Sequence, residues 1–185
     1  MQKCEQMKGL SVYEHGVSVH NYYLDLKNHI LNKSELKYEW KLPEWIYDEF
    51  LWSGLENENT IENYHVFHDC GKPFCLEIDE EGKKHFPNHA EVSSKIWKEL
   101  TGSGLESELM LHDMDIHMLR GSGIEDFCKL PFAKTLLITG LCELHSNASM
   151  FGGVDSTSFK IKWKNINKFG RRILETLKAK EGANM

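Results

Sequence analysis

The sequence YHVFHDCGKP, residues 64–73, joins a helical apolar pattern to two adjacent groups that can bind a metal ion. His68 and Asp69 stand at the end of the pattern, and Pro73 closes it. An imidazole and a carboxylate together suit a divalent ion of intermediate hardness. The stretch therefore predicts a metal site at the end of a helix. The apolar residues of this pattern recur every three positions: Ile61, Tyr64 and Phe67.

Helical periodicity continues along most of the chain, and no segment shows the two-residue alternation of a clear strand. Of the 185 residues, 41% are hydrophobic and 27% are charged, which is typical of a soluble globular domain. The predicted fold class is all-α, one domain over residues 1–185 with about six or seven helices. The motif-bearing core is expected at about 11–150. Helices are expected at 11–32, 61–70, 88–100, 105–119, 131–149 and 156–180.

Polar residues at the expected helix starts follow the capping rules. Ser11 and Glu14, three positions apart, match a capping box at the start of the first helix. Thr60 is the expected cap of the second helix. Asn88 is the expected cap of the third, which places His89 at the first helical position.

Cysteine usage and hydropathy indicate a reducing, aqueous compartment. The five cysteines are odd in number and scattered, so free thiols are expected. Residues 1–6 contain no apolar leader segment, and no run of about 18 apolar residues occurs. We therefore expect a cytoplasmic protein that does not associate with membranes, and nothing in the sequence calls for an obligate protein partner.

Charge is distributed unevenly along the chain. The formal net charge is −6, yet residues 159–180 carry eight Lys or Arg and one acid, Glu175. This basic segment belongs to the expected helix 156–180, which Asp155 or Ser156 can cap. A basic end on an acidic body favours an anionic partner, and a solvated helix face is the alternative explanation.

Further histidines and acids occur at helical intervals around the His68–Asp69 pair. His15 and His20 share the first helix, and His89 begins the third. Glu143 stands out in an otherwise apolar helix, where an unpaired carboxylate is costly unless it binds a partner or a metal. Four such groups crowd the expected helix 105–119: His112, Asp113, Asp115 and His117.

In this order the segments resemble the HD-domain superfamily of metal-dependent phosphohydrolases. HDCGKP (68–73) is close to the HD-x-G-K segment of that family, and HFPNHAEVSS (85–94) resembles its second histidine segment. SVYEHGVSV (11–19) resembles the first, so His15 is preferred to His20. The likeness covers roughly residues 11–150. LLITGLCELHSNAS (136–149) resembles the segment with the last metal-binding Asp, but Glu143 stands at that position, so Asp113 or Asp115 is an alternative ligand.

The resemblance implies an all-helical fold and hydrolysis of phosphate esters with one or two divalent ions, such as Mn, Ni, Co, Fe or Mg. A metal at such a site activates water near neutral pH. The expected metal ligands are His15, His68, Asp69, His89, His112 and Glu143. The expected catalytic residues are His68, Asp69, Lys72, His89 and His112. The residues expected to bind the substrate phosphate are Lys72, Ser156, Ser158, Lys160 and Lys162.

A second resemblance narrows the range of expected substrates. HSNASMFGGVDSTSFKIKW (145–163), taken with the HDCGKP segment, looks like the HD phosphatase modules fused to polynucleotide kinases in nucleic-acid end-healing enzymes. A phosphatase acting on 2′- or 3′-phosphate ends of RNA or DNA is therefore the first hypothesis. Hydrolysis of free nucleotides or (d)NTPs is the second. A non-catalytic, metal-stabilised binding module is the third.

Overall fold

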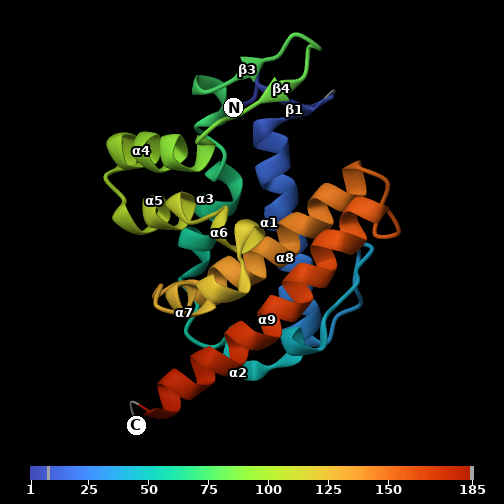
Figure 1. Ribbon diagram of the computed structural model, residues 1–185, viewed down its shortest axis with the longest axis vertical. Helices are drawn as coiled ribbons and strands as arrows, with labels where there is room; N and C mark the ends of the chain where they lie inside the picture. The colour runs from blue at the N-terminus through green and yellow to red at the C-terminus, as the bar shows by residue number, and fades with distance from the viewer. Residues whose placement is uncertain (8, 184–185) are drawn as a thin grey trace. The chain divides into compact units, whose positions relative to one another are not determined.

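The computed structural model describes residues 1–7 and 9–183, of which 65% are helical and 5% lie in strands (Figure 1). The chain is therefore mainly α, as the periodicity predicts. Contacts between residues divide it into two compact units, each built from two separate segments. Unit 1 comprises Met1–His20 and Asn57–Met114, and unit 2 comprises Asn21–Glu56 and Asp115–Met185. In the described ranges, none of the helices has the length and hydrophobicity that crossing a bilayer requires.

Unit 1 contains three principal helices besides the start of α1 (Val12–Asn32), and α5 packs against both α3 and α4. Two short antiparallel hairpins accompany them, with Glu5 opposite Ser11 in one and Glu77 opposite His85 in the other. The expectation of no strands is therefore wrong, because strands of two or three residues are too short to show alternation. The elements are β1 (Glu5–Met7), β2 (Leu10–Ser11), α3 (Glu58–Phe67), the 3-10 turn η2 (Lys72–Phe74), β3 (Glu77–Ile78), β4 (Lys84–His85), α4 (His89–Thr101) and α5 (Gly104–Leu111).

The helix starts of unit 1 follow the capping predictions only in part. The capping box is confirmed, because Ser11 N donates to Glu14 Oε2 at 2.8 Å and Glu14 N donates to Ser11 Oγ at 3.1 Å. Thr60 is wrong as a cap, since Asn57 Oδ1 accepts from Thr60 N at 2.9 Å and α3 begins earlier. Asn88 precedes α4 as expected, but with φ of 53° its side chain makes no capping bond.

The single helix expected at 105–119 is interrupted. Helix α5 ends at Leu111, and α6 (Asp115–Met118) belongs to unit 2. Between them Asp113 is buried and accepts a hydrogen bond from Tyr64 Oη at 2.5 Å. This tertiary bond fixes a turn that a sequence pattern does not reveal, because apolar spacing reports only which face of a helix is covered.

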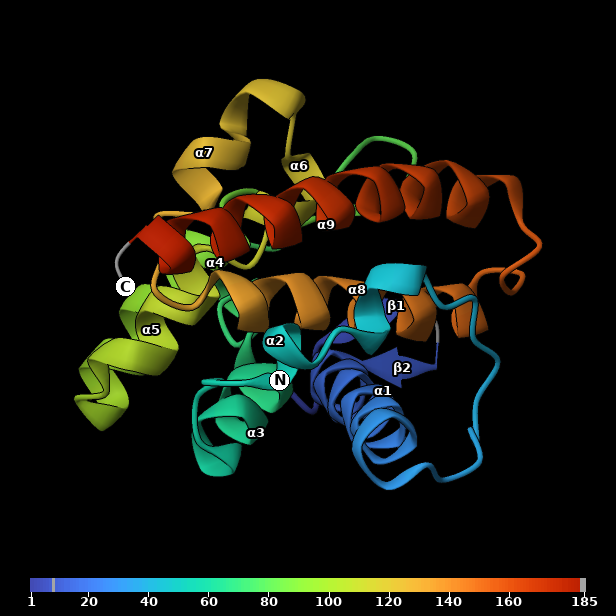
Figure 2. The ribbon, with the colours of Figure 1, turned by 90° about the horizontal axis from the view of Figure 1, so that it is seen from below.

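Unit 2 is built on two long helices, α8 (Ala133–Met150) and α9 (Thr157–Ala183), which lie side by side (Figure 2). A Cβ on Gly170 of α9 would lie 2.4 Å from the Trp45 ring, so the indole packs directly on the helix backbone. Within the described residues there are more helices than expected, because single turns carry no periodic signal. The remaining elements are η1 (Glu44–Tyr47), α2 (Glu49–Trp52), α6, η3 (Gly121–Gly123) and α7 (Ile124–Phe127).

The aromatic residues of segment 33–56 pack within unit 2. Trp45 and Trp52 are buried, and their indole N–H groups donate to backbone carbonyls at 3.1 and 2.7 Å. Trp40 donates to Asp25 Oδ2 at 2.9 Å and lies against the ring of His145, with centroids 4.5 Å apart. These rings therefore hold segment 33–56 onto the long helices.

His145 on α8 fastens this segment through both of its ring nitrogens. Nδ1 donates to Leu141 O at 2.8 Å, so Nε2 is the acceptor for the backbone N–H of Lys41 at 3.1 Å. Burial lowers the pKa of His145 to about 4. The folded protein therefore holds a neutral imidazole here, as a structural group.

Stability is expected to depend on the protonation of His145. Below pH 6.5, His145 is protonated in the unfolded chain but stays neutral in the folded chain. Its contribution to the free energy of unfolding is therefore fully present above about pH 6.5 and is lost as pH falls toward 4. The lowered pKa of His145 changes the free energy of unfolding by up to about 3 kcal/mol over this range. His145→Gln is expected to flatten the pH dependence of the free energy of unfolding between pH 7 and 4.5, measured by urea titration. His29→Gln, which removes a partly exposed imidazole of the same unit, is the control for the substitution itself.

Candidate metal centre

His15 is brought to the His68–Asp69 pair by a close crossing of α1 and α3. A Cβ on Gly16 would lie 2.2 Å from Val66 O and 2.8 Å from His65 O, so the α1 backbone touches the last turn of α3. The ring centroids of His15 and His68 are 5.3 Å apart. Glycine at position 16 is thus the residue that allows the two histidines to meet.

The turn after α3 carries the pair and packs on α4. His68 ends the helix in αR geometry, and Lys72 N donates to Asp69 O at 3.0 Å in the following turn. Gly71 N donates to Ser93 Oγ at 2.9 Å, and a Cβ on Gly71 would lie only 2.5 Å from Ser93 N. The glycine of the HDCGKP segment therefore lets α4 approach, and α4 begins with His89.

Two histidines have their tautomer set by backbone carbonyls. His68 Nδ1 lies 2.8 Å from His65 O and His89 Nδ1 lies 3.0 Å from Phe86 O, so each Nδ1 is the donor. The lone pair of the neutral ring is then on Nε2, the atom that faces Asp69 in both residues. Fixing the ring in this way is how proteins orient metal-binding histidines.

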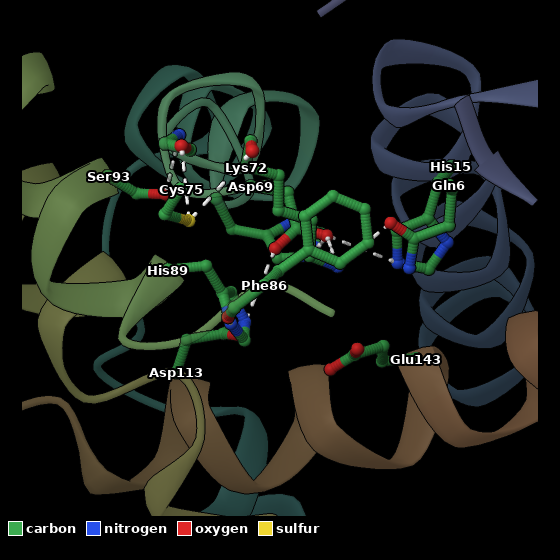
Figure 3. A network of polar contacts seen from close by, with 12 residues as sticks. Gln6, His15, Asp69, Lys72, Cys75, Phe86, His89, Ser93, Asp113 and Glu143 are labelled. Carbon is green, nitrogen blue, oxygen red and sulfur yellow. Dashed lines mark hydrogen bonds and ion pairs between the residues drawn. The ribbon is translucent and has the colours of Figure 1, made fainter. Parts of the chain in front are cut away.

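Asp69 is the common neighbour of these groups (Figure 3). Its Oδ2 lies 3.2 Å from His68 Nε2, 3.8 Å from His15 Nε2 and 2.6 Å from Lys72 Nζ. Its Oδ1 lies 3.5 Å from His89 Nε2 and accepts no hydrogen bond from the described residues, although the carboxylate is 1% exposed. Burial alone would raise the pKa of Asp69, but His68 and Lys72 outweigh burial and hold the pKa well below its usual range.

Three residues form a compact set of ligand atoms. One atom each from His15, His68 and Asp69 lies within 4.8 Å of the other two, and all three side chains are buried. Two nitrogens and a carboxylate oxygen suit Mn, Fe, Co, Ni or Zn. The buried Oδ1 of Asp69, which no hydrogen bond satisfies within the described residues, fits a group whose natural partner is a cation.

Lys72 is part of this centre and is only 7% exposed. Its ammonium donates to Asp69 Oδ2 at 2.6 Å and to Gln6 Oε1 at 2.8 Å, and it lies 5.3 Å from the centroid of the Phe86 ring. Gln6 belongs to β1 and Phe86 follows β4, so each short hairpin supplies one neighbour. Lys72 is therefore not a surface lysine, and its ammonium neutralises a buried carboxylate.

Two of the predicted site residues, His112 and Asp113, directly follow α5. A carboxylate oxygen of Asp113 lies within 4.8 Å of a ring nitrogen of His68, and Asp113 Oδ1 also accepts a hydrogen bond from the Tyr64 hydroxyl. Asp113, left open by the sequence beside Asp115, is thus placed next to the predicted ligands of unit 1. His112 directly follows the last residue of α5 and is half-buried, and its role as ligand or catalyst stays a prediction.

Other predicted site residues lie elsewhere in the two units. His20 contacts His65, with their Nδ1 atoms 3.3 Å apart, whereas His15 faces Asp69. Glu143 lies on α8 of unit 2, where its Oε2 is 2.7 Å from His117 Nε2. Its assignment as a metal ligand stays a prediction. The four predicted substrate-binding residues of unit 2 lie at the start of α9: Ser156, Ser158, Lys160 and Lys162.

Sequence reasoning missed Gln6, Phe86 and Ser93 as supports of the centre. Phe86 and Ser93 fall inside the HFPNHAEVSS segment, so their proximity to His89 was a usable signal. Gln6 lies in a three-residue strand with no pattern to mark it. Comparisons with protein-family models, curated proteins and solved structures gave no match to this chain.

Proposed function

We propose that this chain is an HD-type, divalent-metal-dependent phosphohydrolase that removes phosphate from the ends of nucleic acids. The observation that supports it best is the convergence of His15, His68 and Asp69 within 4.8 Å, all buried. The same residues carry the sequence likeness to the HD superfamily. Geometry and motif therefore point to the same chemistry through the same atoms.

The donor set fits a divalent ion held mainly by His15, His68 and Asp69. When bound there, such an ion supplies an activated water near neutral pH and withdraws charge from a phosphoryl oxygen. His68 Nε2 is directed at this position by the bond from its Nδ1 to His65 O. Asp113 lies next to His68 and offers a further carboxylate for the same ion or a second one.

His89 and Lys72 have separate tasks in this proposal. The His89 side chain is 18% exposed, more than the other groups around Asp69, so its Nε2 can reach a substrate. In its imidazolium form, with a proton on each ring nitrogen, it would give the Nε2 proton to the leaving oxygen. Lys72 keeps Asp69 ionised through the 2.6 Å contact and adds positive charge near the phosphate site.

The proposal for nucleic-acid ends rests on the charge of α9. The exposed cations Lys162, Lys164 and Lys168 have no ion-pair partner among the residues described. Exposed basic side chains along a helix suit the phosphate backbone of a nucleic acid, and their binding releases counterions. Hydrolysis at a polynucleotide end is therefore expected to weaken as salt concentration rises.

The test is a hydrolysis panel with protein first stripped of metal by a chelator. Mn, Ni, Co, Fe or Mg is then added separately, and phosphate release is measured from an aryl phosphate, 3′- and 5′-nucleotides, a dNTP, and short RNA and DNA with a 3′-phosphate. We expect metal-dependent release, fastest from the oligonucleotides and slowed by salt. Preference for free nucleotides without a salt effect would favour a nucleotidase.

If no substrate of the panel releases phosphate with any of the metals, the enzymatic proposal is overturned. In that case chelation should still lower the melting temperature if the centre holds a metal without catalysing hydrolysis. If neither the chelator nor added metal changes the melting temperature, the protein also lacks the metal site. The two readouts therefore separate a non-catalytic metal module from a chain that binds no metal.

A further inference from the structure

A cavity of about 350 Å³ lies in unit 2, where the end of α8 meets the beginning of α9. This volume falls within the range of small-molecule sites. The two helices are joined by a tight reversal at Gly152 and Gly153, whose φ angles are 92° and 76°, values that favour glycine. Gly153 N donates to Ala148 O at 2.7 Å and fixes this reversal. The cavity thus lies beside a defined turn between two long helices.

Two phenylalanine rings line the cavity and differ in exposure. Phe159 is 3% exposed, and its ring meets the His145 ring edge-on with centroids 5.0 Å apart. Because His145 is held through both nitrogens, the Phe159 ring has a firm support. Phe151 lines the same cavity but is 57% exposed. An exposed ring beside a buried one offers a surface on which a flat aromatic ligand can stack.

The polar lining residues add groups of defined type. Asn147 contributes a side-chain amide, which carries both donors and an acceptor, as the edge of a nucleobase does. Ser158 contributes a hydroxyl and Lys162 an ammonium. Lys162 is exposed and has no ion-pair partner among the described residues, whereas Lys160 lies 3.3 Å from Asp155. Lys162 is therefore the better of the two predicted lysines for an anion at this cavity.

The helix terminus itself contributes little to this site. Ser156 Oγ accepts from Phe159 N at 3.3 Å, so the first turn of α9 is capped by its own chain. An anion at this cavity would therefore be bound mainly by the Lys162 side chain, which lines it. Recognition at the cavity then depends on side chains that can be changed one at a time.

We propose that this cavity binds a nucleotide, with the base against Phe151 and Phe159 and the phosphate at Lys162. A planar heteroaromatic ring, an amide-complementary edge and one nearby anionic group are together the features of a nucleotide. The site goes beyond the proposed phosphohydrolase activity and does not require it, because binding is a property of unit 2 alone. The bound nucleotide is either free or the terminal residue of a strand.

The experiment measures binding to the full chain after metal removal, so that no probe is hydrolysed. AMP is titrated by calorimetry, and a fluorescein-labelled hexadeoxynucleotide is titrated by anisotropy at several salt concentrations. Phe151→Ala is expected to weaken binding about fivefold or more, because loss of one stacked base contact has at least that effect. Lys162→Gln should weaken binding as well and lower the salt dependence by about one counterion.

Matched variants separate the cavity from a general basic surface. Lys164→Gln removes the same charge two residues further along α9 and outside the cavity lining, and it should change the affinity for AMP, which has no polynucleotide backbone, less than about twofold. Ile161→Ala removes an apolar side chain that is 60% exposed and is the control for Phe151→Ala. Equal losses of AMP affinity in Lys162→Gln and Lys164→Gln would contradict the cavity in favour of a diffuse basic surface.

The two probes identify the form of the nucleotide. Binding of AMP with the expected variant pattern supports a free-nucleotide site, and binding of the hexamer alone supports a strand end. Binding of neither probe overturns the proposal. None of these results depends on the metal-loaded activity panel, so a failed hydrolysis assay and an absent nucleotide site are distinguishable.

Discussion

Replacing Asp69 by asparagine is expected to lower divalent-metal affinity by at least about 100-fold, because Asp69 supplies the only charge among the three converging ligand atoms of unit 1. A bound metal stabilises the folded chain by about 2.7 kcal/mol at 100 times its dissociation constant. In the wild type, added Mn or Ni should therefore raise the melting temperature. In Asp69→Asn this increase should disappear, together with metal recovered by elemental analysis after desalting.

The metal-free form of Asp69→Asn is also expected to be less stable than the metal-free wild type. Lys72 is 7% exposed and pairs with Asp69 Oδ2 at 2.6 Å, so the variant leaves a buried ammonium without its counter-charge. Breaking a buried pair from one side costs about 3–5 kcal/mol. The double variant Asp69→Asn, Lys72→Met removes both charges and should recover much of that stability. It should still fail to bind metal.

The double variant makes the metal assignment falsifiable without relying on fold loss. Asp79→Asn is a matched control, since Asp79 is a half-exposed carboxylate of the same unit paired with His85 at 2.7 Å. This control should keep the wild-type response to metal. A folded double variant that binds Mn or Ni as tightly as the wild type would contradict the centre.

Gly16→Ala is expected to destabilise the protein by about 3 kcal/mol or more, at the upper end of overpacking effects. The added methyl would lie 2.2 Å from Val66 O and 2.8 Å from His65 O. Both are backbone atoms of α3, so no rotamer change relieves the overlap and the helices must separate. For a chain of this size the loss corresponds to a fall in melting temperature of about 6–12 °C. Thermal and urea unfolding of the metal-free protein measure it.

The same change should weaken metal binding, because His15 is the next residue and moves with α1. Gly104→Ala is the control: no atom lies within 4 Å of a Cβ at this first position of α5. Alanine there should be neutral or stabilising by up to about 1 kcal/mol. If Gly16→Ala melts at the wild-type temperature, the close crossing of α1 and α3 is wrong.

The sequence predicted those parts of the fold that depend on local chemistry. The Ser11–Glu14 capping box and the start of α4 at His89 both follow from residue types at fixed spacings. The break after Leu111 was missed, because it depends on the bond between Tyr64 and Asp113, residues far apart in the chain. Periodicity carries no information about such a bond.

The candidate site was predictable to a similar degree. The resemblance to the HD superfamily singled out His15, His68 and Asp69, which converge, and it preferred His15 to His20. It gave no sign that Lys72 is buried between Asp69 and Gln6, since the partner on β1 lies in a strand without a pattern. Burial depends on which distant segments cover a residue, and a single sequence does not encode this in its local spacing.

The interleaved order of the two units has a consequence for synthesis on the ribosome. His15 emerges early, but unit 1 is complete only when the chain reaches Met114, after residues 21–56 of unit 2 have emerged. Residues 21–56 cannot complete unit 2 until α8 and α9 have been synthesised, and these are translated last among the described helices. The nascent chain can therefore assemble the metal centre before the two long helices exist. Neither unit can be cut from the gene as one continuous fragment.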